Sequence, residues 1–242
     1  MSYIFREHIK QSLAVIAFLI TLTACTSESY DAGDGPNSYL TADLVLLHTS
    51  QDKLVRSALL DDGTTLQFSN PFAQDWLTRP DSVYRALLYY DKTVAASDAA
   101  ASNPTATSIV RARSVRPVSV LRPVEAEDME TLRTDPVGFE SLWMSKNGSY
   151  INLSLLLKSG KTEADDALHA LGIVSHGTTT DADRRRTLNL TLYHDQGGVP
   201  AYYTVQQYVS IPTQLLEEAD TVELTLNTYN GKKVVKVAVS NL

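Results

Sequence analysis

The sequence predicts an all-β protein: a small OB-like Greek-key barrel, then an antiparallel β-sandwich, both following a cleaved lipoprotein signal peptide. Three observations support this prediction. Short segments rich in Val, Leu, Ile, Thr and Tyr recur along the chain with apolar and polar residues alternating, which is typical of strands. Asp-Gly and Asn-Gly pairs lie between several of these segments, as tight hairpin turns require. The N-terminus has a basic start and an apolar run that ends near a lone cysteine.

The leader over residues 1–24 has the composition of a bacterial signal peptide. Its apolar run, residues 13–22, is too short to cross a bilayer as a helix. The tetrapeptide Leu22-Thr23-Ala24-Cys25 resembles the site that the lipoprotein signal peptidase cuts. We therefore expect cleavage after Ala24 and attachment of acyl chains to Cys25, which would hold the protein on a membrane. The alternative is an uncleaved signal anchor in which the cysteine is there by chance.

The composition disfavours several classes of protein. The formal net charge is −7, and nucleic-acid binding depends largely on Lys and Arg side chains that neutralise phosphates, so we expect no nucleic-acid partner. Cys25 is the only cysteine, so no disulfide can form within the chain, and a lipidated Cys25 leaves no thiol nucleophile or cysteine-based metal site. We expect no cofactor.

The chain divides by composition into successive segments. After the signal peptide, residues 25–37 are rich in Ser, Asp and Gly without apolar periodicity, which predicts a flexible lipidated tether. Residues 124–137 are acidic, and we expect a linker there. The OB-like barrel is then expected over residues 38–123 and the β-sandwich over residues 138–242.

The first domain shows the order of elements of an OB-fold, three strands, a short helix and two further strands. Asp62-Gly63 predicts a two-residue type I′ turn between the second and third strands. Asn70 and Pro71 suit the start of the helix. The expected elements are strands near 44–48, 54–60, 64–68, 83–90 and 109–121, and the helix over 70–80.

Three features of this domain allow a functional and a structural interpretation. The adjacent carboxylates Asp61 and Asp62 could form a catalytic or metal-binding pair, but we favour turn chemistry, because Asp is preferred in turns for its own backbone hydrogen bonds. The Ala/Ser-rich segment 95–106 is either a ligand loop of the OB-fold or disordered. Four arginines on or near the last strand suggest an anion or polysaccharide site, or a strand edge protected by charge; they are Arg111, Arg113, Arg116 and Arg122.

The second domain predicts seven short strands with turn signals between them, as in an antiparallel sandwich. Asn147-Gly148 and Asn230-Gly231 mark two tight turns, and a helical turn is expected within 213–219, after Pro212. The expected strands are 139–144, 150–157, 168–174, 188–194, 202–211, 222–228 and 234–239.

No residue pattern in this domain predicts a catalytic or metal site. His169, His176 and His194 have no local spacing that makes a ligand pair, so we expect no metal. Asp181 and Asp183 resemble the start of a calcium loop but lack the glycine and glutamate that complete one. No nucleophile elbow, phosphate-binding loop or zinc-protease motif occurs, and we expect no enzyme activity and no catalytic residues.

Several short motifs together resemble the NigD-like lipoproteins of Bacteroides-type bacteria. They are the site before Cys25, the Leu59–Leu66 segment, Asp135-Pro136 before Leu142-Trp143-Met144, Tyr150–Leu153, Leu168–Leu171 and Leu192-Tyr193-His194. The resemblance implies an N-terminal OB-like domain and a C-terminal β-sandwich. It departs from the family's Gly-x-Arg before the fourth strand, where this chain has Asp81 to Arg85. The family is named for a proposed bacteriocin-immunity role and supplies no catalytic residues.

Together these observations predict a non-enzymatic lipoprotein of the bacterial cell envelope, anchored through Cys25, and we expect the outer membrane as its location. We expect it to bind a protein, peptide or glycan outside the cytoplasm. The side of the membrane that the body faces and the ligand-binding residues stay open. The alternatives are a bacteriocin immunity protein and an envelope polysaccharide hydrolase, whose two carboxylates need no fixed spacing in sequence.

Overall fold

A computed structural model describes residues 40–92, 108–161, 168–216 and 219–239. Residues Leu40–Leu242 belong to one compact unit. The expected signal peptide, Cys25, the tether and the segment 95–106 lie outside the described residues.

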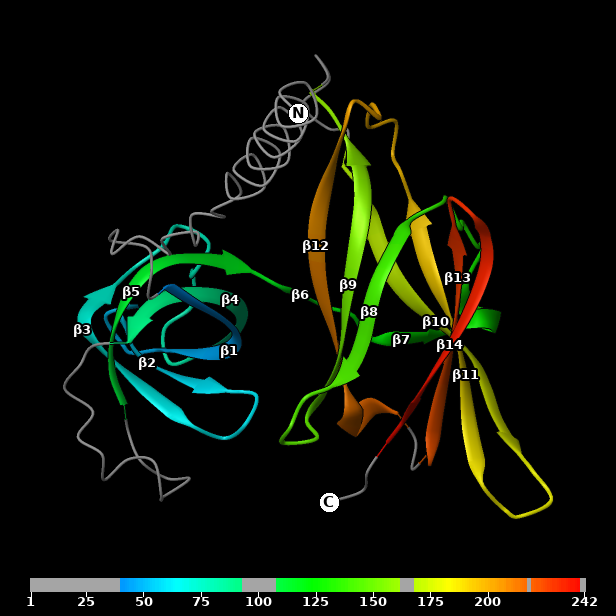
Figure 1. Cartoon of the computed structure of the whole chain (residues 1–242), viewed down its shortest axis with the longest axis horizontal. Coiled ribbons are helices and arrows are strands. Elements are labelled where there is room, and N and C mark those ends of the chain that lie inside the picture. The colour runs from blue at the N-terminus through cyan, green and yellow to red at the C-terminus, as the bar shows by residue number, and fades with distance from the viewer. Residues whose placement is uncertain (1–39, 93–107, 162–167, 217–218, 240–242) are drawn as a thin grey trace, which may run out of the picture. The chain divides into compact units, whose positions relative to one another are not determined.

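The first five strands form a closed barrel with the order β1-β2-β3-β5-β4. Neighbouring strands are antiparallel except β3 and β5, which pair in parallel over three residues of each strand. The OB-like barrel expected from the sequence is confirmed, and Figure 1 shows it in blue to green. Its strands are β1 (Leu40–Thr49), β2 (Val55–Leu60), β3 (Thr65–Phe72), β4 (Val83–Lys92) and β5 (Ser108–Pro117).

The β2–β3 hairpin occurs where it was expected, but its turn is not of type I′. Type I′ needs a positive φ at both central residues, and here Gly63 has φ 88° whereas Asp62 does not have a positive φ. The Gly63 N–H donates to the Leu60 carbonyl, and the Leu60 N–H donates to the Thr64 carbonyl. This pattern is a three-residue loop with a glycine bulge, which leaves Asp61 free to point away from the hairpin.

The helix expected over 70–80 is wrong. The β3 strand continues to Phe72, and residues 73–82 are turns and irregular chain. Asn70 does not cap a helix because its amide pairs with the backbone of Ala112, donating to the carbonyl and accepting from the N–H. Its side chain thus acts as a strand neighbour to β5. The apolar residues Trp76 and Leu77 pack against the barrel core instead of forming a helical face.

The segment expected to be one long strand over 109–121 breaks at Val118. β5 ends at Pro117, the buried Val118 donates its N–H to the Arg85 carbonyl, and β6 (Ser119–Val120) then joins a sheet of the sandwich. The chain therefore passes directly from barrel to sandwich. The segment expected to be a linker contains part of β7 (Pro123–Glu125), which pairs in parallel with β10, and the short 3-10 helix η3 (Ala126–Asp128).

The sandwich consists of a five-stranded sheet with the order β14-β13-β11-β10-β7 and a four-stranded sheet with the order β6-β12-β9-β8 (Figure 1). All seven strands expected in this domain occur, six of them within a few residues of the expected bounds, whereas the strand expected over 168–174 continues to Thr180. η4 (Thr213–Leu215) supplies the helical turn after Pro212. The seven strands are β8 (Gly138–Met144), β9 (Tyr150–Ser159), β10 (Ala170–Thr180), β11 (Arg186–Asp195), β12 (Tyr203–Pro212), β13 (Thr221–Thr228) and β14 (Gly231–Ala238).

Burial follows the strand period. Alternate residues of β11 and β13 are buried, and β9 is buried on both faces over Ile151–Leu155. The sandwich core fills the space between its two sheets, and a smaller core fills the barrel. A third apolar cluster joins the two, with Leu44 and Leu87 from the barrel and Val118 from the crossing segment. This third cluster forms the base of the candidate site.

Candidate functional site

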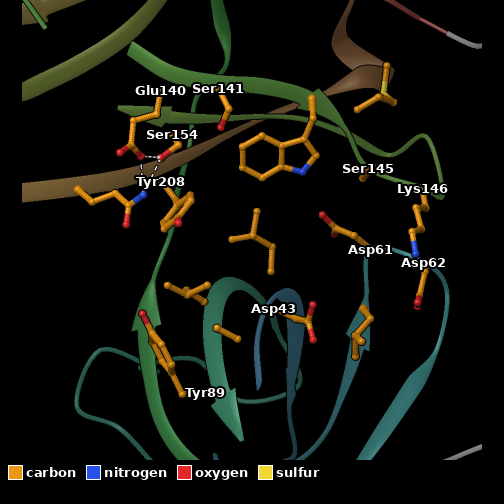
Figure 2. A pocket seen from close by; sticks show the side chains of 17 residues that line it. Asp43, Asp61, Asp62, Tyr89, Glu140, Ser141, Ser145, Lys146, Ser154 and Tyr208 are labelled. Atoms are coloured by element: carbon orange, nitrogen blue, oxygen red, sulfur yellow. Dashed lines mark hydrogen bonds between the residues drawn. The ribbon is translucent and has the colours of Figure 1, made fainter. Parts of the chain in front are cut away.

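A cleft of about 430 Å³ lies between the barrel and the four-stranded sheet of the sandwich (Figure 2). Its volume is within the range of pockets that hold small ligands or single side chains. From the barrel it is lined by Ala42, Asp43, Leu44, Leu60, Asp61, Asp62, Leu87 and Tyr89, and from the sandwich by Glu140, Ser141, Trp143, Met144, Ser145, Lys146, Ser154, Gln206 and Tyr208.

Aromatic side chains surround the apolar base of this cleft. Trp143 on β8 and Tyr208 on β12 meet edge to face, with ring centroids 6.4 Å apart. Together with Tyr89 from the barrel they pack against Leu44 and Leu87, yet all three rings remain partly exposed. Fixed and partly exposed rings of this kind offer a ligand a large contact area at little cost in conformational entropy.

Glu140 is the carboxylate of the sandwich wall. It lies at an irregularity of the β8–β9 pairing between Phe139 and Ser141, and such a bulge redirects a side chain out of the regular alternation. The carboxylate accepts hydrogen bonds from the Ser154 hydroxyl at 2.6 Å and from the Gln206 amide at 2.5 Å. These two bonds, the one from Ser154 foremost, hold the pKa of Glu140 below its ordinary value. Glu140 is therefore a charged, positioned acceptor.

Asp43 is the carboxylate of the opposite wall, on β1 (Figure 2). It accepts a hydrogen bond of 2.8 Å from the Tyr90 hydroxyl. Burial, together with this carboxylate, raises the pKa of Tyr90, so the phenol stays protonated and remains a donor. Asp43 is thus fixed in place by a neutral donor.

The turn between β2 and β3 and the one between β8 and β9 close one end of the cleft. Asp62 accepts a hydrogen bond from the Thr64 N–H, and this bond, with the nearby charge of Lys146, keeps the pKa of Asp62 low. The Asn147 N–H donates to the Asp61 carbonyl at 2.7 Å, which ties the two turns together. The end of the cleft is therefore built jointly by barrel and sandwich.

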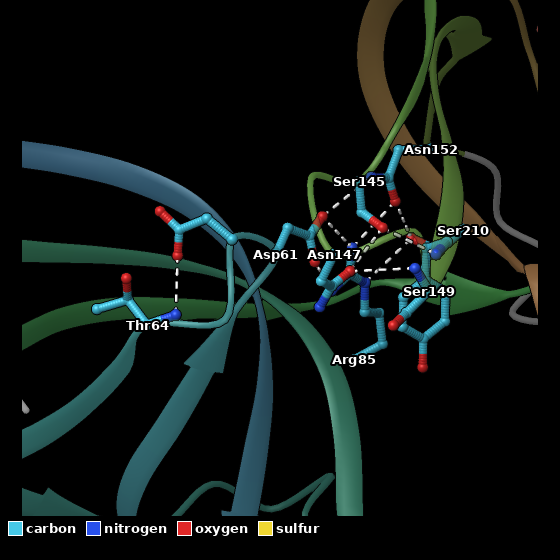
Figure 3. Close-up of polar contacts among 10 residues, drawn as sticks. Asp61, Thr64, Arg85, Ser145, Asn147, Ser149, Asn152 and Ser210 are labelled. Atoms are coloured by element: carbon cyan, nitrogen blue, oxygen red, sulfur yellow. Dashed lines mark hydrogen bonds and ion pairs between the residues drawn. The ribbon is translucent and has the colours of Figure 1, made fainter. Parts of the chain in front are cut away.

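A buried arginine joins the two halves of the site (Figure 3). Arg85 extends from β4, and its side chain is only 1% exposed. Its two Nη atoms donate to the two carboxylate oxygens of Asp61 at 2.5 and 2.7 Å. The same guanidinium donates to Asn152 and Ser210 of the sandwich, at 3.0 and 3.1 Å.

This network satisfies the buried charge from both sides. The guanidinium carbon of Arg85 lies 4.3 Å from the centre of the Tyr150 ring, and the Asn152 amide donates to Asp61 at 3.0 Å. The Ser210 hydroxyl donates to Asn152 at 2.7 Å. A buried ion pair is weak support for stability in general but fixes geometry when every partner is satisfied. Here the hydrogen bonds of Arg85 and Asp61 with Asn152 and Ser210 tie the barrel wall of the cleft to the sandwich wall.

The other candidate residues from the sequence do not gather into a site. The four arginines at 111, 113, 116 and 122 are exposed and do not line the cleft, and Arg113 pairs with Asp91 across β4 and β5. Asp181 accepts from the N–H groups of Asp183 and Arg185 and so stabilises a turn. Among the described residues, no three His, Cys, Asp or Glu side chains form a group that could hold a metal ion.

Two histidines that are far apart in sequence meet in the sandwich. His169 Nδ1 lies 2.9 Å from His194 Nε2, and the rings stack with centroids 5.2 Å apart. His194 is 1% exposed, and its Nδ1 lies 2.9 Å from the Asp135 carbonyl oxygen, which can only accept. We infer that His194 carries its proton on Nδ1 and accepts from His169 through Nε2. Two neutral rings satisfy this chain of bonds.

This pair predicts a loss of stability in mild acid. Burial, and then the neighbouring His194, lower the pKa of His169. The His169 ring of the folded protein therefore takes up a second ring proton less readily than it does in the unfolded chain. The stabilisation is present above the ordinary histidine pKa of about 6.5 and is lost as the pH falls through the lowered folded value. In urea unfolding between pH 7.5 and 5, His169→Asn should flatten the pH dependence. His176→Asn, at an exposed histidine, should keep it unchanged.

Comparison with known proteins identifies the family of the sandwich domain. Residues 120–239 match the family model of the NigD-like C-terminal beta sandwich domain, which covers the sandwich from the end of β6 through β14. No curated protein matches the chain.

Three solved structures illustrate the shared fold. A NigD-like immunity protein from Bacteroides caccae is 22% identical over 81% of this chain and 91% of its own, with a TM-score of 0.60. A candidate toxin-related protein from Parabacteroides distasonis is 19% identical over 82% and 92%, with a TM-score of 0.55. A candidate lipoprotein from Bacteroides fragilis is 12% identical over 83% and 98%, with a TM-score of 0.57. The match to the family model shows that the chain carries the C-terminal beta sandwich domain of the NigD-like family, and the solved structures share the fold of the whole chain.

Proposed function

We propose that the protein is a non-enzymatic lipoprotein of the cell envelope that binds an extracytoplasmic ligand in the cleft between barrel and sandwich. The cleft itself is the observation that carries this proposal. It combines an aromatic and apolar base, formed around Leu44 and Trp143, with hydrogen-bonding groups on both walls. A mostly apolar pocket with a few positioned polar groups is the usual form of a ligand site.

The protonation of the cleft favours binding over hydrolysis. A glycosidase needs one carboxyl group whose pKa is raised, so that it can act as an acid. The pKa values of Glu140 and Asp62 are both lowered, and Asp61 is held by the buried Arg85. Glu140 and Asp62 are therefore suited to accept hydrogen bonds as carboxylates and not to donate a proton. Turnover of an envelope polysaccharide by the purified protein that disappears in Glu140→Gln would contradict this proposal.

The proposed location rests on the leader sequence. We propose that Cys25, after cleavage behind Ala24, carries the acyl chains that attach the protein to the outer membrane. The similar fold of a candidate lipoprotein from Bacteroides fragilis supports this proposal. In the parts of the chain that the structure describes, no helix is long and apolar enough to span a bilayer.

Bacteriocin immunity is the second candidate function. It is favoured by the structural similarity to a NigD-like immunity protein from Bacteroides caccae, which covers 81% of this chain. In this role the anchored protein would intercept a toxin at the envelope, and the cleft would be the surface that holds it. Deleting the gene should then make cells sensitive to a bacteriocin encoded nearby.

A cleft-filling variant tests both candidates. Ala42 is exposed on the barrel wall of the cleft, so Ala42→Trp should fill the cavity and reproduce the phenotype of the gene deletion. Thr180→Trp, on an exposed residue of β10 outside the cleft, is the matched control and should behave as the wild type. A folded Ala42→Trp protein that restores every function of the deleted gene would contradict a role for the cleft. Toxin sensitivity of the deletion strain separates immunity from other binding roles.

A further inference from the structure

The charges in the cleft indicate what kind of ligand it takes. We propose that the cleft binds a segment of a peptide or protein that carries arginine or lysine. This inference rests on the proposed function, since it names the ligand class of the same site. Its basis is the balance of charge on the two walls, together with the aromatic rings between them.

Of the four carboxylates among the described residues that line the cleft, one is already neutralised by an ion pair and a second lies near a cation. Both oxygens of Asp61 accept from Arg85. Asp62 lies near Lys146, the one cationic side chain among the described residues that line the cleft, and the charge of that lysine helps to lower the pKa of Asp62. The charge of Asp61 is therefore compensated by the ion pair with Arg85, and that of Asp62 is partly offset by Lys146.

The other two carboxylates have only neutral partners in the hydrogen bonds described above. Glu140 accepts from Ser154 and Gln206, and Asp43 accepts from the Tyr90 hydroxyl. These bonds orient the carboxylates without cancelling their charges. One negative charge therefore stands on the sandwich wall and one on the barrel wall, as Figure 2 shows.

The aromatic rings favour a cation on a long apolar stem. Trp143, Tyr208 and Tyr89 line the space that a side chain entering between the charged walls would occupy. The methylene groups of Lys and Arg pack on such rings while the charged head reaches a carboxylate, and the ring faces themselves attract cations. A guanidinium can also bind a carboxylate through two parallel hydrogen bonds. A neutral sugar would use the rings but leave both charges unpaired.

The cleft also suits a side chain better than a bare metal ion. Its two unpaired carboxylates come from opposite walls, and no third ligand of the kind a metal needs joins them among the described residues. A volume of about 430 Å³ accommodates one or two amino-acid side chains. The remainder of the peptide would then lie outside the cleft.

Paired peptides test the proposal directly. The probe is acetyl-Gly-Arg-Tyr-Arg-Gly-amide, and its control has citrulline in place of both arginines, which keeps the shape and removes the charge. Calorimetric titration of the mature protein, residues 25–242, should give binding of the arginine peptide about tenfold tighter than of the control, as expected for charge-assisted hydrogen bonds. Raising the NaCl concentration to 0.5 M should weaken binding of the arginine peptide only.

Carboxylate-to-amide variants locate the effect. Glu140→Gln and Asp43→Asn keep acceptors for the existing hydrogen bonds and should each reduce the affinity for the arginine peptide several-fold, with unchanged circular dichroism. Asp183 is an exposed carboxylate on the β10–β11 turn, outside the cleft. Asp183→Asn also removes one negative charge and should leave the affinity for the arginine peptide unchanged. Equal losses in all three variants would mean a nonspecific charge effect and would overturn the proposal.

Failure of this inference can be distinguished from failure of the proposed function. If the two peptides bind equally or not at all, while neutral oligosaccharides bind and are excluded by Ala42→Trp, the ligand class is wrong and the cleft remains a binding site. If Ala42→Trp also affects no ligand and no phenotype of the deletion strain, both proposals are wrong.

Discussion

Asp61→Asn is expected to lower the free energy of unfolding by about 3–5 kcal/mol, the cost of leaving one member of a buried ion pair without its partner. Arg85 is 1% exposed, and a guanidinium cannot lose its proton to escape the burial. An amide offers the two Nη atoms only one acceptor and no charge. Urea unfolding should show the loss. Asp62→Asn is the control, since Asn can still accept from the Thr64 N–H, and it should change stability by less than about 1 kcal/mol.

Replacing the other member of the ion pair, Arg85, should lower the free energy of unfolding by less. Asp61 is 20% exposed, so without Arg85 it can recover water or take up a proton, and Met at position 85 would fill the space with apolar atoms. We expect Arg85→Met to be less destabilising than Asp61→Asn, and the double variant to be more stable than the sum of the two changes predicts. Additive effects would mean that the ion pair makes no energetic contribution to folding.

Leu153→Ala is expected to destabilise the sandwich by about 2–5 kcal/mol, because it removes buried methyl groups and leaves a cavity. Leu153 is 0% exposed near the middle of β9, between neighbours β8 and β12. Leu132 is 44% exposed, so Leu132→Ala, the same chemical change, should stay within about 0.5 kcal/mol of the wild type. Thermal or urea unfolding measures both. Comparable losses in the two variants would contradict the assignment of the core to this strand.

The strands of the sandwich were predictable because each carries its own local signal. In β11 and β13 every second residue is buried. Gly148 and Gly231, which follow Asn147 and Asn230 in two hairpin turns, have a positive φ. The helix predicted over 70–80 does not form, because a long-range contact there outweighs the local signal. Asn70 has the right side chain to cap a helix, but its partner is Ala112, which is remote in sequence and becomes a neighbour only when the barrel closes.

The candidate site was not predictable for the same physical reason. Its walls combine residues of β1 with residues of β8 and β12, and no local spacing records that Asp43 and Glu140 line one cavity. Asp61 was correctly placed in a turn, yet its main partner is Arg85 on another strand. His169 and His194 likewise meet only through the pairing of β10 with β11. Sequence period predicts which face is buried, whereas long-range packing decides which polar groups meet.

The central claim is that a ligand binds in the cleft between barrel and sandwich, and the two tryptophans of the chain can test it. Trp143 lines the cleft, whereas Trp76 packs against Tyr84 of the barrel and does not. Protein labelled with 5-fluorotryptophan should give one fluorine resonance for each, assigned by Trp76→Phe. Fractions of an envelope extract from the cells that produce the protein should shift the Trp143 resonance and leave that of Trp76 in place, and Ala42→Trp should abolish the shift. A fraction that demonstrably binds the protein without moving the Trp143 resonance would contradict the claim.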